Sequence, residues 1–321
     1  MPSVRVAVFD LGSSSFHLMV VDAFRDGRLV PVLRRRSFLH LGTEVAKTGE
    51  VPRERSTAAV AAVRRLQEAA DKAGADVTVA LATAALRDAT NGAGVLARLE
   101  RELGTPITLV SGDEEARLCF IGQRAGVWVG ADPVLGFDLG GGSLEAAVGT
   151  ADSVLAVTSV ALGTARIQGE FSTGDVLSAE ERRAISDVAV ARAEPIKAMV
   201  VGEPMAARRV IASGGTVRAL AKLAMGIHRP PPASGASTSV NQVEVPAGQL
   251  AELADRLASL DLESRLALPG IQARRAPLLP IGAIVLSALV EHLGLSGLVV
   301  SEWGLREGAI LDRLALTAAA D

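Results

Sequence analysis

The sequence contains no tyrosine, and aromatic residues make up only 3% of its 321 residues. Side chains on which nucleic-acid bases could stack are therefore scarce, and the formal net charge of −3 excludes nucleic-acid binding through overall charge. Cys119 is the single cysteine, so an intrachain disulfide or a cysteine zinc cluster cannot form. It stands in the apolar segment Leu118–Ile121, where we expect a buried packing role. The four histidines lack the spacing of a histidine metal site.

Long apolar runs are missing as well. No unbroken apolar segment reaches the ~18–20 residues that span a membrane, and the first residues lack the apolar core of a signal peptide. We therefore expect no membrane partner and a cytoplasmic location. Apolar residues at 49% and charged residues at 21% are typical of a globular protein, and 321 residues suggest two domains.

Two segments of the chain resemble each other. Asp10–Ser15 reads Asp-Leu-Gly-Ser-Ser-Ser, and Asp138–Ser143 reads Asp-Leu-Gly-Gly-Gly-Ser. Apolar runs at 4–9 and 16–21 flank the first turn, and runs at 134–137 and 145–148 flank the second, so each segment predicts a hairpin. This internal duplication predicts two similar α/β domains that face each other across a cleft.

Apolar spacing predicts the other main elements. Strands are expected at 77–82, 107–110, 209–212 and 298–301, and helices at 53–73, 91–103, 178–200, 247–259, 278–293 and 305–316, with a further helix from Ser111. Residues 229–239 are rich in Pro, Ser and Gly and predict a loop. We place the first domain at 1–127 and the second at 128–302, with the helix at about 303–321 packing back on the first.

The duplicated turns are the first candidates for chemistry. Glycine lets a backbone approach a phosphate closely, successive N–H groups form an anion site, and serine hydroxyls add donors. A carboxylate at the start of each turn, Asp10 or Asp138, fits a hard cation held between protein and phosphate. A single turn could simply close a hairpin, but the matched pair favours phosphate binding. The candidate residues are Gly12, Ser13, Ser14, Ser15, Gly140, Gly141, Gly142 and Ser143.

A third small-residue turn, Ser213–Thr216, follows an expected strand and opens an expected helix. Free N–H groups and the helix dipole favour an anion there, which makes Gly214, Gly215 and Thr216 candidates. An ordinary strand-to-helix turn capped by Thr216 explains the pattern equally well.

Carboxylates cluster in Ser111–Arg117, which reads Ser-Gly-Asp-Glu-Glu-Ala-Arg. Ser111 and Glu114 fit a capping box at a helix start, which gives Glu114 a structural role. Glu115 has no such assignment. It either complements the helix dipole, which the residues alone favour, or acts as a general base that orients an attacking water.

Arginine supplies further candidates. Arg87 follows the expected strand 77–82 and could contact phosphate bidentately, or form a surface pair with Asp88. The run Arg34–Arg36 and the pairs Arg208-Arg209 and Arg274-Arg275 are interpreted as solvated faces.

Six motifs in this order are similar to those of the exopolyphosphatase/guanosine pentaphosphatase family, a branch of the actin, Hsp70 and sugar-kinase superfamily. They are Asp10–His17, Ala82–Arg87, Ser111–Arg117, Asp138–Glu145, Ala212–Thr216 and Leu305–Gly308. The resemblance spans essentially the whole chain. It implies two duplicated ribonuclease-H-like domains with an active site in the cleft between them.

The resemblance also implies roles for single residues. Glu115 corresponds to the family's water-activating glutamate, and Arg87 to a phosphate contact. Asp138 contributes to metal binding, and Glu145 stands where an acidic residue lies near the metal. We therefore predict catalytic Glu115, Arg87 and Asp138, with Asp10, Asp138 and Glu145 at the metal. The expected metal is Mg²⁺, with Mn²⁺ as an alternative and K⁺ as a stimulating ion, and the expected assembly is a homodimer.

The chain departs from the family pattern at two positions and in length. Ser14 replaces the usual asparagine, which predicts altered phosphate affinity, and Leu144 stands where threonine is common. Longer members carry additional C-terminal helical domains, so preference for long chains and processivity stay open.

Four functions remain under consideration. The leading hypothesis is a Mg²⁺-dependent exopolyphosphatase that releases orthophosphate from inorganic polyphosphate. The second is hydrolysis of guanosine pentaphosphate to the tetraphosphate by the same groups. The third is a polyphosphate or alarmone sensor with little turnover, which the joint presence of Glu115, Asp138 and Arg87 disfavours. The fourth is a kinase, since Ser213–Thr216 occupies the superfamily's adenosine-motif position.

Overall fold

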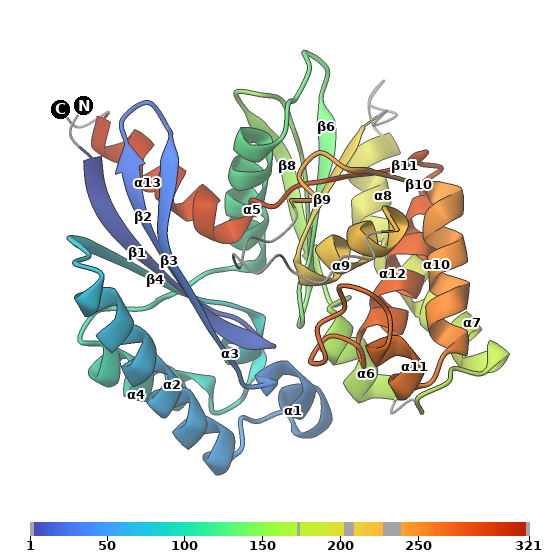
Figure 1. Cartoon of the computed structure of the whole chain (residues 1–321), viewed down its shortest axis with the longest axis horizontal. Coiled ribbons are helices and arrows are strands. Elements are labelled where there is room, and N and C mark those ends of the chain that lie inside the picture. The colour runs from blue at the N-terminus through green and yellow to red at the C-terminus, as the bar shows by residue number, and fades with distance from the viewer. Residues whose placement is uncertain (1–2, 172–173, 202–208, 227–238, 319–321) are drawn as a thin grey trace.

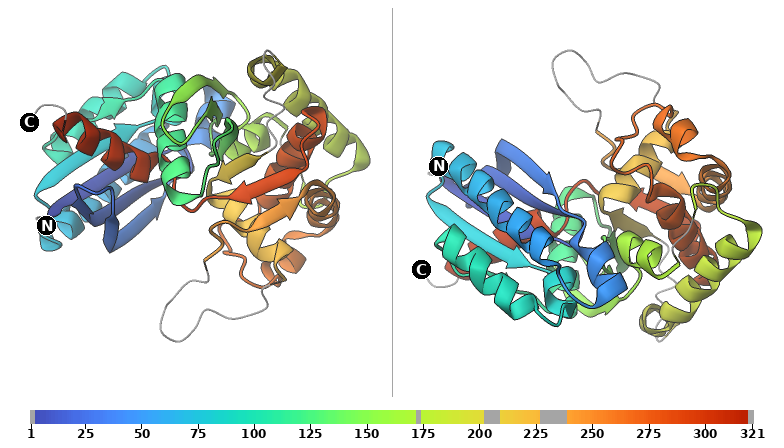
Figure 2. Two further views of the ribbon diagram at one scale, coloured as in Figure 1. Left: turned by 90° about the horizontal axis from the view of Figure 1, so that it is seen from above. Right: turned by 90° about the horizontal axis from the view of Figure 1, so that it is seen from below.

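The structure is a computed structural model that describes residues 3–171, 174–201, 209–226 and 239–318. Two β-sheets lie side by side, each flanked by helices, with the first half of the chain around one sheet and the second half around the other (Figures 1 and 2). Among the described residues, no helix combines the length and apolar character needed to cross a membrane.

The first sheet has the strand order β3-β2-β1-β4-β5. Its strands are β1 (Ser3–Leu11), β2 (Ser15–Phe24), β3 (Leu29–Phe38), β4 (Val77–Ala82) and β5 (Thr108–Leu109). β1, β2 and β3 form an antiparallel meander, while β4 and β5 run parallel to β1. Because β1 is central and covered on both faces, its residues Val6 to Phe9 are all buried, which explains the continuous apolar run in the sequence.

The second sheet repeats this arrangement. Its strands are β6 (Val134–Leu139), β7 (Leu144–Gly149), β8 (Val154–Val160), β9 (Val210–Ser213), β10 (Glu244–Pro246) and β11 (Gly297–Val300). Read from β8, the order is β8-β7-β6-β9-β11, with β10 added at the edge. The meander and the parallel strands therefore match the first sheet one for one. The predicted fold class, two duplicated α/β domains, is confirmed.

Helices cover the faces of both sheets. Around the first sheet lie α1 (Leu41–Thr48), α2 (Arg53–Lys72), α3 (Ala84–Asp88) and α4 (Gly92–Leu103). Around the second lie α6 (Thr164–Phe171), α7 (Ala179–Arg192), α8 (Glu194–Val201), α9 (Gly215–Ala224), α10 (Ala247–Ser259), α11 (Leu262–Leu266) and α12 (Leu279–His292). α12 is the core helix of the second half, because apolar residues surround it and the side chains from Leu279 to Leu286 are buried.

Two helices connect the halves. α5 (Gly112–Gly126) follows the first sheet but packs against β6, β7 and β8 of the second, whereas α13 (Leu305–Ala318) follows the second sheet and packs on β1. The helices contact each other where they cross, as Figure 1 shows between the sheets. A Cβ atom on Gly308 would overlap the carbonyl oxygen of Leu118, so only glycine permits this approach. The crossing places the start of both helices beside the duplicated turns.

Three details differ from the sequence-based expectations. The helix expected at 178–200 is two helices, because Pro195 lacks an N–H donor and α7 ends before it. Only half of the capping box forms, since Ser111 Oγ accepts from the Glu114 N–H while the Glu114 carboxylate binds Arg117 instead. The strand expected at 107–110 contains two residues. The predicted loop 229–239 lies almost entirely outside the described residues, and the domain boundaries stay a prediction.

Candidate active site

The two duplicated turns meet at one end of the two sheets and form the wall of a pocket of about 160 Å³. The turn between β1 and β2 lies against the turn between β6 and β7, and a Cβ atom on Gly141 would overlap the hydroxyl of Ser14. Glycine in the second turn is thus required by the contact between the turns. The pocket is lined by all the predicted phosphate-binding residues: Gly12, Ser13, Ser14, Ser15, Gly140, Gly141, Gly142, Ser143, Gly214, Gly215 and Thr216.

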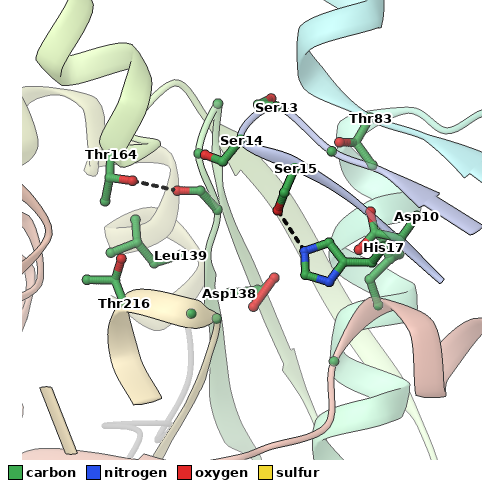
Figure 3. Close-up of a pocket in the computed structure, with 18 of the residues that line it drawn as sticks. Asp10, Ser13, Ser14, Ser15, His17, Thr83, Asp138, Leu139, Thr164 and Thr216 are labelled. Carbon is green, nitrogen blue, oxygen red and sulfur yellow. Dashed lines mark hydrogen bonds between the residues drawn. The ribbon is translucent and has the colours of Figure 1, made fainter. Parts of the chain in front are cut away.

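The serine hydroxyls of the first turn have different partners. Ser13 Oγ accepts a hydrogen bond from the Ala85 N–H at 3.1 Å, which fixes the start of α3 against the turn. Ser15 Oγ lies 2.8 Å from His17 Nε2, the contact drawn in Figure 3. Ser13 and Ser15 are both buried.

Asp10 and Asp138 occupy equivalent positions near the ends of β1 and β6, and both line the pocket. Asp138 accepts hydrogen bonds from Ser213 Oγ at 2.6 Å and, more weakly, from Cys119 Sγ at 3.6 Å. Asp10 Oδ2 lies 3.9 Å from Arg306 Nε. Burial, with the negative charge of Asp138 adding to it against Arg306, raises the pKa of Asp10 to about 6. Burial also raises the pKa of Asp138.

These raised pKa values bear on the predicted metal. Two carboxylates with raised pKa values that line one pocket fit a divalent cation, and Mg²⁺ needs only one or two protein carboxylates beside water and phosphate oxygens. Asp10 and Asp138 meet this requirement. Among the described residues, no group of three or more His, Cys, Asp or Glu side chains comes close enough to hold a metal ion. The three-carboxylate set that includes Glu145 stays a prediction.

Glu115 lies in the first turn of α5 and lines the pocket with only 7% of its surface exposed. Its Oε2 accepts a hydrogen bond from Arg87 Nη1 at 3.3 Å, and the same Nη1 donates to the Val110 carbonyl at 2.9 Å. Burial and the nearby charge of Glu145 raise the pKa of Glu115 well above its ordinary value, against the opposing effect of Arg87. A carboxylate with a raised pKa is a stronger base near neutral pH.

Neither Arg87 nor Glu145 is among the residues that line the pocket. The Arg87 guanidinium pairs with Glu115 and, at 3.7 Å, with Asp88. Glu145 is buried and accepts from Ser159 Oγ at 2.9 Å. Burial, with the charge of Asp138 adding to it, raises the pKa of Glu145 to about 7. Arg87 thus contacts Glu115, a carboxylate of the pocket, whereas Glu145 contacts Ser159.

A basic wall continues from the pocket into a second, larger pocket of about 510 Å³. We use "basic wall" for the cationic residues of this second pocket: Arg34, Arg35, Arg36, Arg218, Lys222, Arg274, Arg275 and Arg306. Four of them, Arg218, Arg274, Arg275 and Arg306, also line the first pocket, so the two spaces share one boundary.

Neighbouring cations of the basic wall disfavour each other's charged form. Burial followed by the neighbouring Arg274 lowers the pKa of Arg36 to about 10, and burial followed by Arg218 lowers the pKa of Arg275 to about 9. Arg36 Nη1 is buried and has no hydrogen-bond partner. Arg36 and Arg275 are thus partly buried cations with lowered pKa values, and one nitrogen of Arg36 lacks a partner, which indicates a site for an anion whose binding would supply both charge and acceptors.

Sequence reasoning interpreted these arginines as solvated faces, and Arg34, Arg35 and Arg274 are indeed exposed, whereas Arg36 and Arg275 are partly buried. All five line the second pocket. They come from β3 and from the loop before α12, and they meet Arg218 of α9 and Arg306 of α13 only in the folded chain. The run of three arginines in one strand was the available signal, although an edge strand such as β3 often carries charged side chains.

His17 is a further pocket residue that sequence reasoning did not assign. Its Nε2 contacts Ser15, and its Nδ1 lies 2.8 Å from Arg306 Nη1. Burial and the charge of Arg306 lower its pKa well below the ordinary value, so the ring is neutral at physiological pH.

The family model that describes the Ppx/GppA phosphatase family matches residues 20–317. The chain belongs to the Ppx/GppA phosphatase family. The family resemblance stated from the motifs is thereby confirmed, and so is the prediction of an enzyme, because the relatives carry the names of phosphohydrolases.

Individual relatives agree with this. The chain is 30% identical over 317 residues to the protein named exopolyphosphatase 1 of Mycobacterium tuberculosis, covering 97% of this chain and 88% of that one. It is 29% identical to the protein named guanosine-5'-triphosphate,3'-diphosphate pyrophosphatase of Aeromonas hydrophila, covering 95% of this chain and 58% of that one. The crystal structure of the Ppx/GppA family member of Aquifex aeolicus superposes with a TM-score of 0.80 at 25% identity, covering 98% and 99% of the two chains.

Proposed function

We propose that this member of the Ppx/GppA phosphatase family is an exopolyphosphatase that removes terminal orthophosphate from inorganic polyphosphate. The observation that carries the proposal is the basic wall, which leads directly away from the turns that would hold the terminal phosphate. Inorganic polyphosphate carries a negative charge at each phosphate, and the seven arginines and one lysine that line this space could pair with it. The pairing would relieve the repulsion that lowers the pKa of Arg36 and Arg275.

The terminal phosphate would lie between the two turns. Backbone N–H groups of the glycine-rich turns and the hydroxyls of Ser14 and Ser15 are the donors that line this position. Glu115 stands at the edge of the same pocket and would accept a proton from a water molecule as its oxygen attacks the terminal phosphorus. The bond to the remaining chain then breaks, and orthophosphate leaves. Positioning and charge stabilisation supply most of the rate in such transfers.

Magnesium fits this site at Asp10 and Asp138, with the predicted Glu145 behind them. When bound, the ion would withdraw charge from the phosphate oxygens. Arg87 would hold the Glu115 carboxylate in place through the 3.3 Å hydrogen bond and oppose the rise of its pKa. Mn²⁺ as a substitute, K⁺ stimulation, the homodimer and the cytoplasmic location stay predictions.

The alternative substrate is guanosine pentaphosphate, as the name of the Aeromonas hydrophila relative suggests. We expect a guanine base to bind by stacking on an aromatic side chain. Among the described residues of the second pocket none is Phe or Trp, and Arg274 lies 4.1 Å from the centre of the Phe38 ring in the first pocket. Phe38, the only Phe or Trp among the described residues that line the first pocket, is thus already covered on one face. This observation favours polyphosphate.

Orthophosphate release tests the proposal. The enzyme is given long-chain polyphosphate, short polyphosphate or guanosine pentaphosphate, with and without Mg²⁺. We expect Mg²⁺-dependent release from polyphosphate and a loss of ~10²–10⁴ in kcat for Glu115→Gln, the usual range for a positioned base. Glu114→Gln is the matched control, because this neighbouring carboxylate binds Arg117 instead of lining the pocket.

Three other outcomes would change the conclusion. Release mainly from guanosine pentaphosphate would replace polyphosphate by the nucleotide. Binding without release from any substrate would support the sensor. Equal losses in the Glu114 and Glu115 variants would remove Glu115 from the role of base.

A further inference from the structure

A chain of side chains connects α13 to the first phosphate turn through His17. Arg306 Nη1 lies 2.8 Å from His17 Nδ1, and His17 Nε2 lies 2.8 Å from Ser15 Oγ. All three residues line the phosphate pocket. The ring of His17 lies between the hydroxyl and the guanidinium, and Figure 3 shows it pointing toward Ser15.

The hydrogen-bonding rules of these groups leave one arrangement. A guanidinium only donates, so Nδ1 of His17 must accept with its lone pair. A neutral imidazole carries its one proton on the other nitrogen, so Nε2 must donate to Ser15 Oγ. Ser15 Oγ then serves as acceptor toward the ring, and its own O–H hydrogen is left to point elsewhere.

We propose that His17 is a positioning residue that turns the Ser15 hydroxyl into a dedicated hydrogen-bond donor for the terminal phosphate. The inference rests on the proposed function, because it assumes a phosphate between the two turns. Without the ring, the Ser15 hydroxyl could donate to any acceptor nearby, and part of the binding energy would be spent on orienting it. The Arg306 contact fixes the tautomer, as hydrogen bonds to the second ring nitrogen generally do.

The contrast with Ser13 supports this role. Ser13 Oγ also accepts a hydrogen bond, from the Ala85 N–H at 3.1 Å, but that donor belongs to the backbone of α3 and is independent of side-chain identity. At Ser15 the donor is a side chain whose proton position depends on α13, a helix from the far end of the chain. His17 therefore links the orientation of one phosphate contact to the docking of α13.

The first test reads the tautomer directly and needs no activity. In protein labelled with ¹⁵N-histidine, two-bond ¹H–¹⁵N spectra distinguish a protonated from an unprotonated ring nitrogen. The chain has only four histidines, and His17→Gln identifies the signal of His17. We expect Nε2 protonated and Nδ1 unprotonated. A ring protonated at Nδ1, or at both nitrogens, would overturn the inference even if the enzyme hydrolyses polyphosphate.

The second test is a double-mutant cycle on orthophosphate release from polyphosphate. We expect Ser15→Ala and His17→Leu each to lower kcat/KM by about 10- to 100-fold, the range for a hydrogen bond to a charged group. If His17 acts through Ser15, His17→Leu has no further effect once Ser15 is alanine. Losses that multiply in the double variant would show that His17 acts independently of Ser15 and would reject the inference.

A conservative variant separates positioning from folding. In His17→Gln the amide oxygen can accept from Arg306 and the amide N–H₂ can donate to Ser15, so we expect kcat/KM within about threefold of wild type. His292→Gln is the matched control at a surface histidine bonded to Glu194. A Gln variant as impaired as the Leu variant would contradict the assigned donor and acceptor roles. An inactive wild type would instead reject the proposed function and with it the role of His17 toward a phosphate, whereas the tautomer measurement would still test the Ser15–His17–Arg306 arrangement by itself.

Discussion

The two Gly/Ser turns come from duplicated hairpins, yet their surroundings differ. Asp10 lies within 3.9 Å of a guanidinium, that of Arg306, whereas Asp138 is held by the neutral donors Ser213 and Cys119. The first turn uses serine side chains bound by Ala85 and His17, and the second uses glycines that pack against the first. The duplication thus supplies two turns of similar backbone, and the residues that differ give each turn its own hydrogen bonds and charges.

The carboxylates at the start of the two turns give the largest expected difference. We expect Asp138→Asn to reduce the apparent affinity for Mg²⁺ by at least ~100-fold, and Asp10→Asn to reduce it less, because Arg306 already neutralises part of the Asp10 charge. Mg²⁺ titrations of orthophosphate release measure both effects. Equal shifts for the two variants would show that the turns contribute alike to the metal.

The pKa of Asp10 predicts how stability depends on pH. Its folded-state pKa of about 6 lies above the ordinary 3.8, so the native state favours the protonated form. The associated stability is present below about pH 4 and is lost as the pH rises through 6, roughly 3 kcal/mol in all. Without divalent cations, Asp10→Asn should therefore be more stable than wild type at pH 8, with no such gain at pH 4. Urea unfolding at both pH values, with EDTA, measures this, and a gain of the same size at pH 4 would contradict it.

The basic wall contains residues from both halves of the chain, and a substitution there should change substrate binding and stability in opposite directions. Arg275→Ala removes a cation whose pKa is lowered by burial and by its neighbours, so we expect higher thermal stability together with a KM for long polyphosphate raised about 10- to 100-fold. Arg183→Ala, at an exposed position of α7, is the control. A variant that loses stability along with affinity would show that Arg275 supports the fold.

The crossing of α5 and α13 gives the smallest expected effect. Gly308→Ala should destabilise the protein by about 1–3 kcal/mol, because its Cβ would meet the backbone of Leu118. Gly94→Ala in α4 meets nothing within 4 Å and should stabilise by about 0.4–1 kcal/mol. Urea unfolding of both variants compares them. A neutral Gly308→Ala would mean that the two helices can separate at little cost.

Much of this protein could be predicted from local sequence patterns. Apolar runs on each side of a Gly/Ser turn predict a hairpin whatever surrounds them, and two such turns with the same first residues predict a repeated fold. The eleven phosphate-binding candidates belong to three turns, and each turn keeps its own residues together, but only folding brings the three turns to one pocket. Pro195 is a helix breaker that the sequence shows, but the continuous apolar spacing over 178–200 favoured a single helix.

What the sequence by itself determined is the set of local structures: the strands, the turns and the carboxylates at their ends. The tertiary structure alone decided which distant residues share a surface. Arg36, Arg218, Arg275 and Arg306 come from β3, α9, the loop before α12 and α13, and they meet only in the folded chain, where Ser15 also receives its donor from a histidine held by α13. Local patterns extend over a few residues, whereas the charge of a pocket and the direction of a hydroxyl depend on groups that only folding brings together.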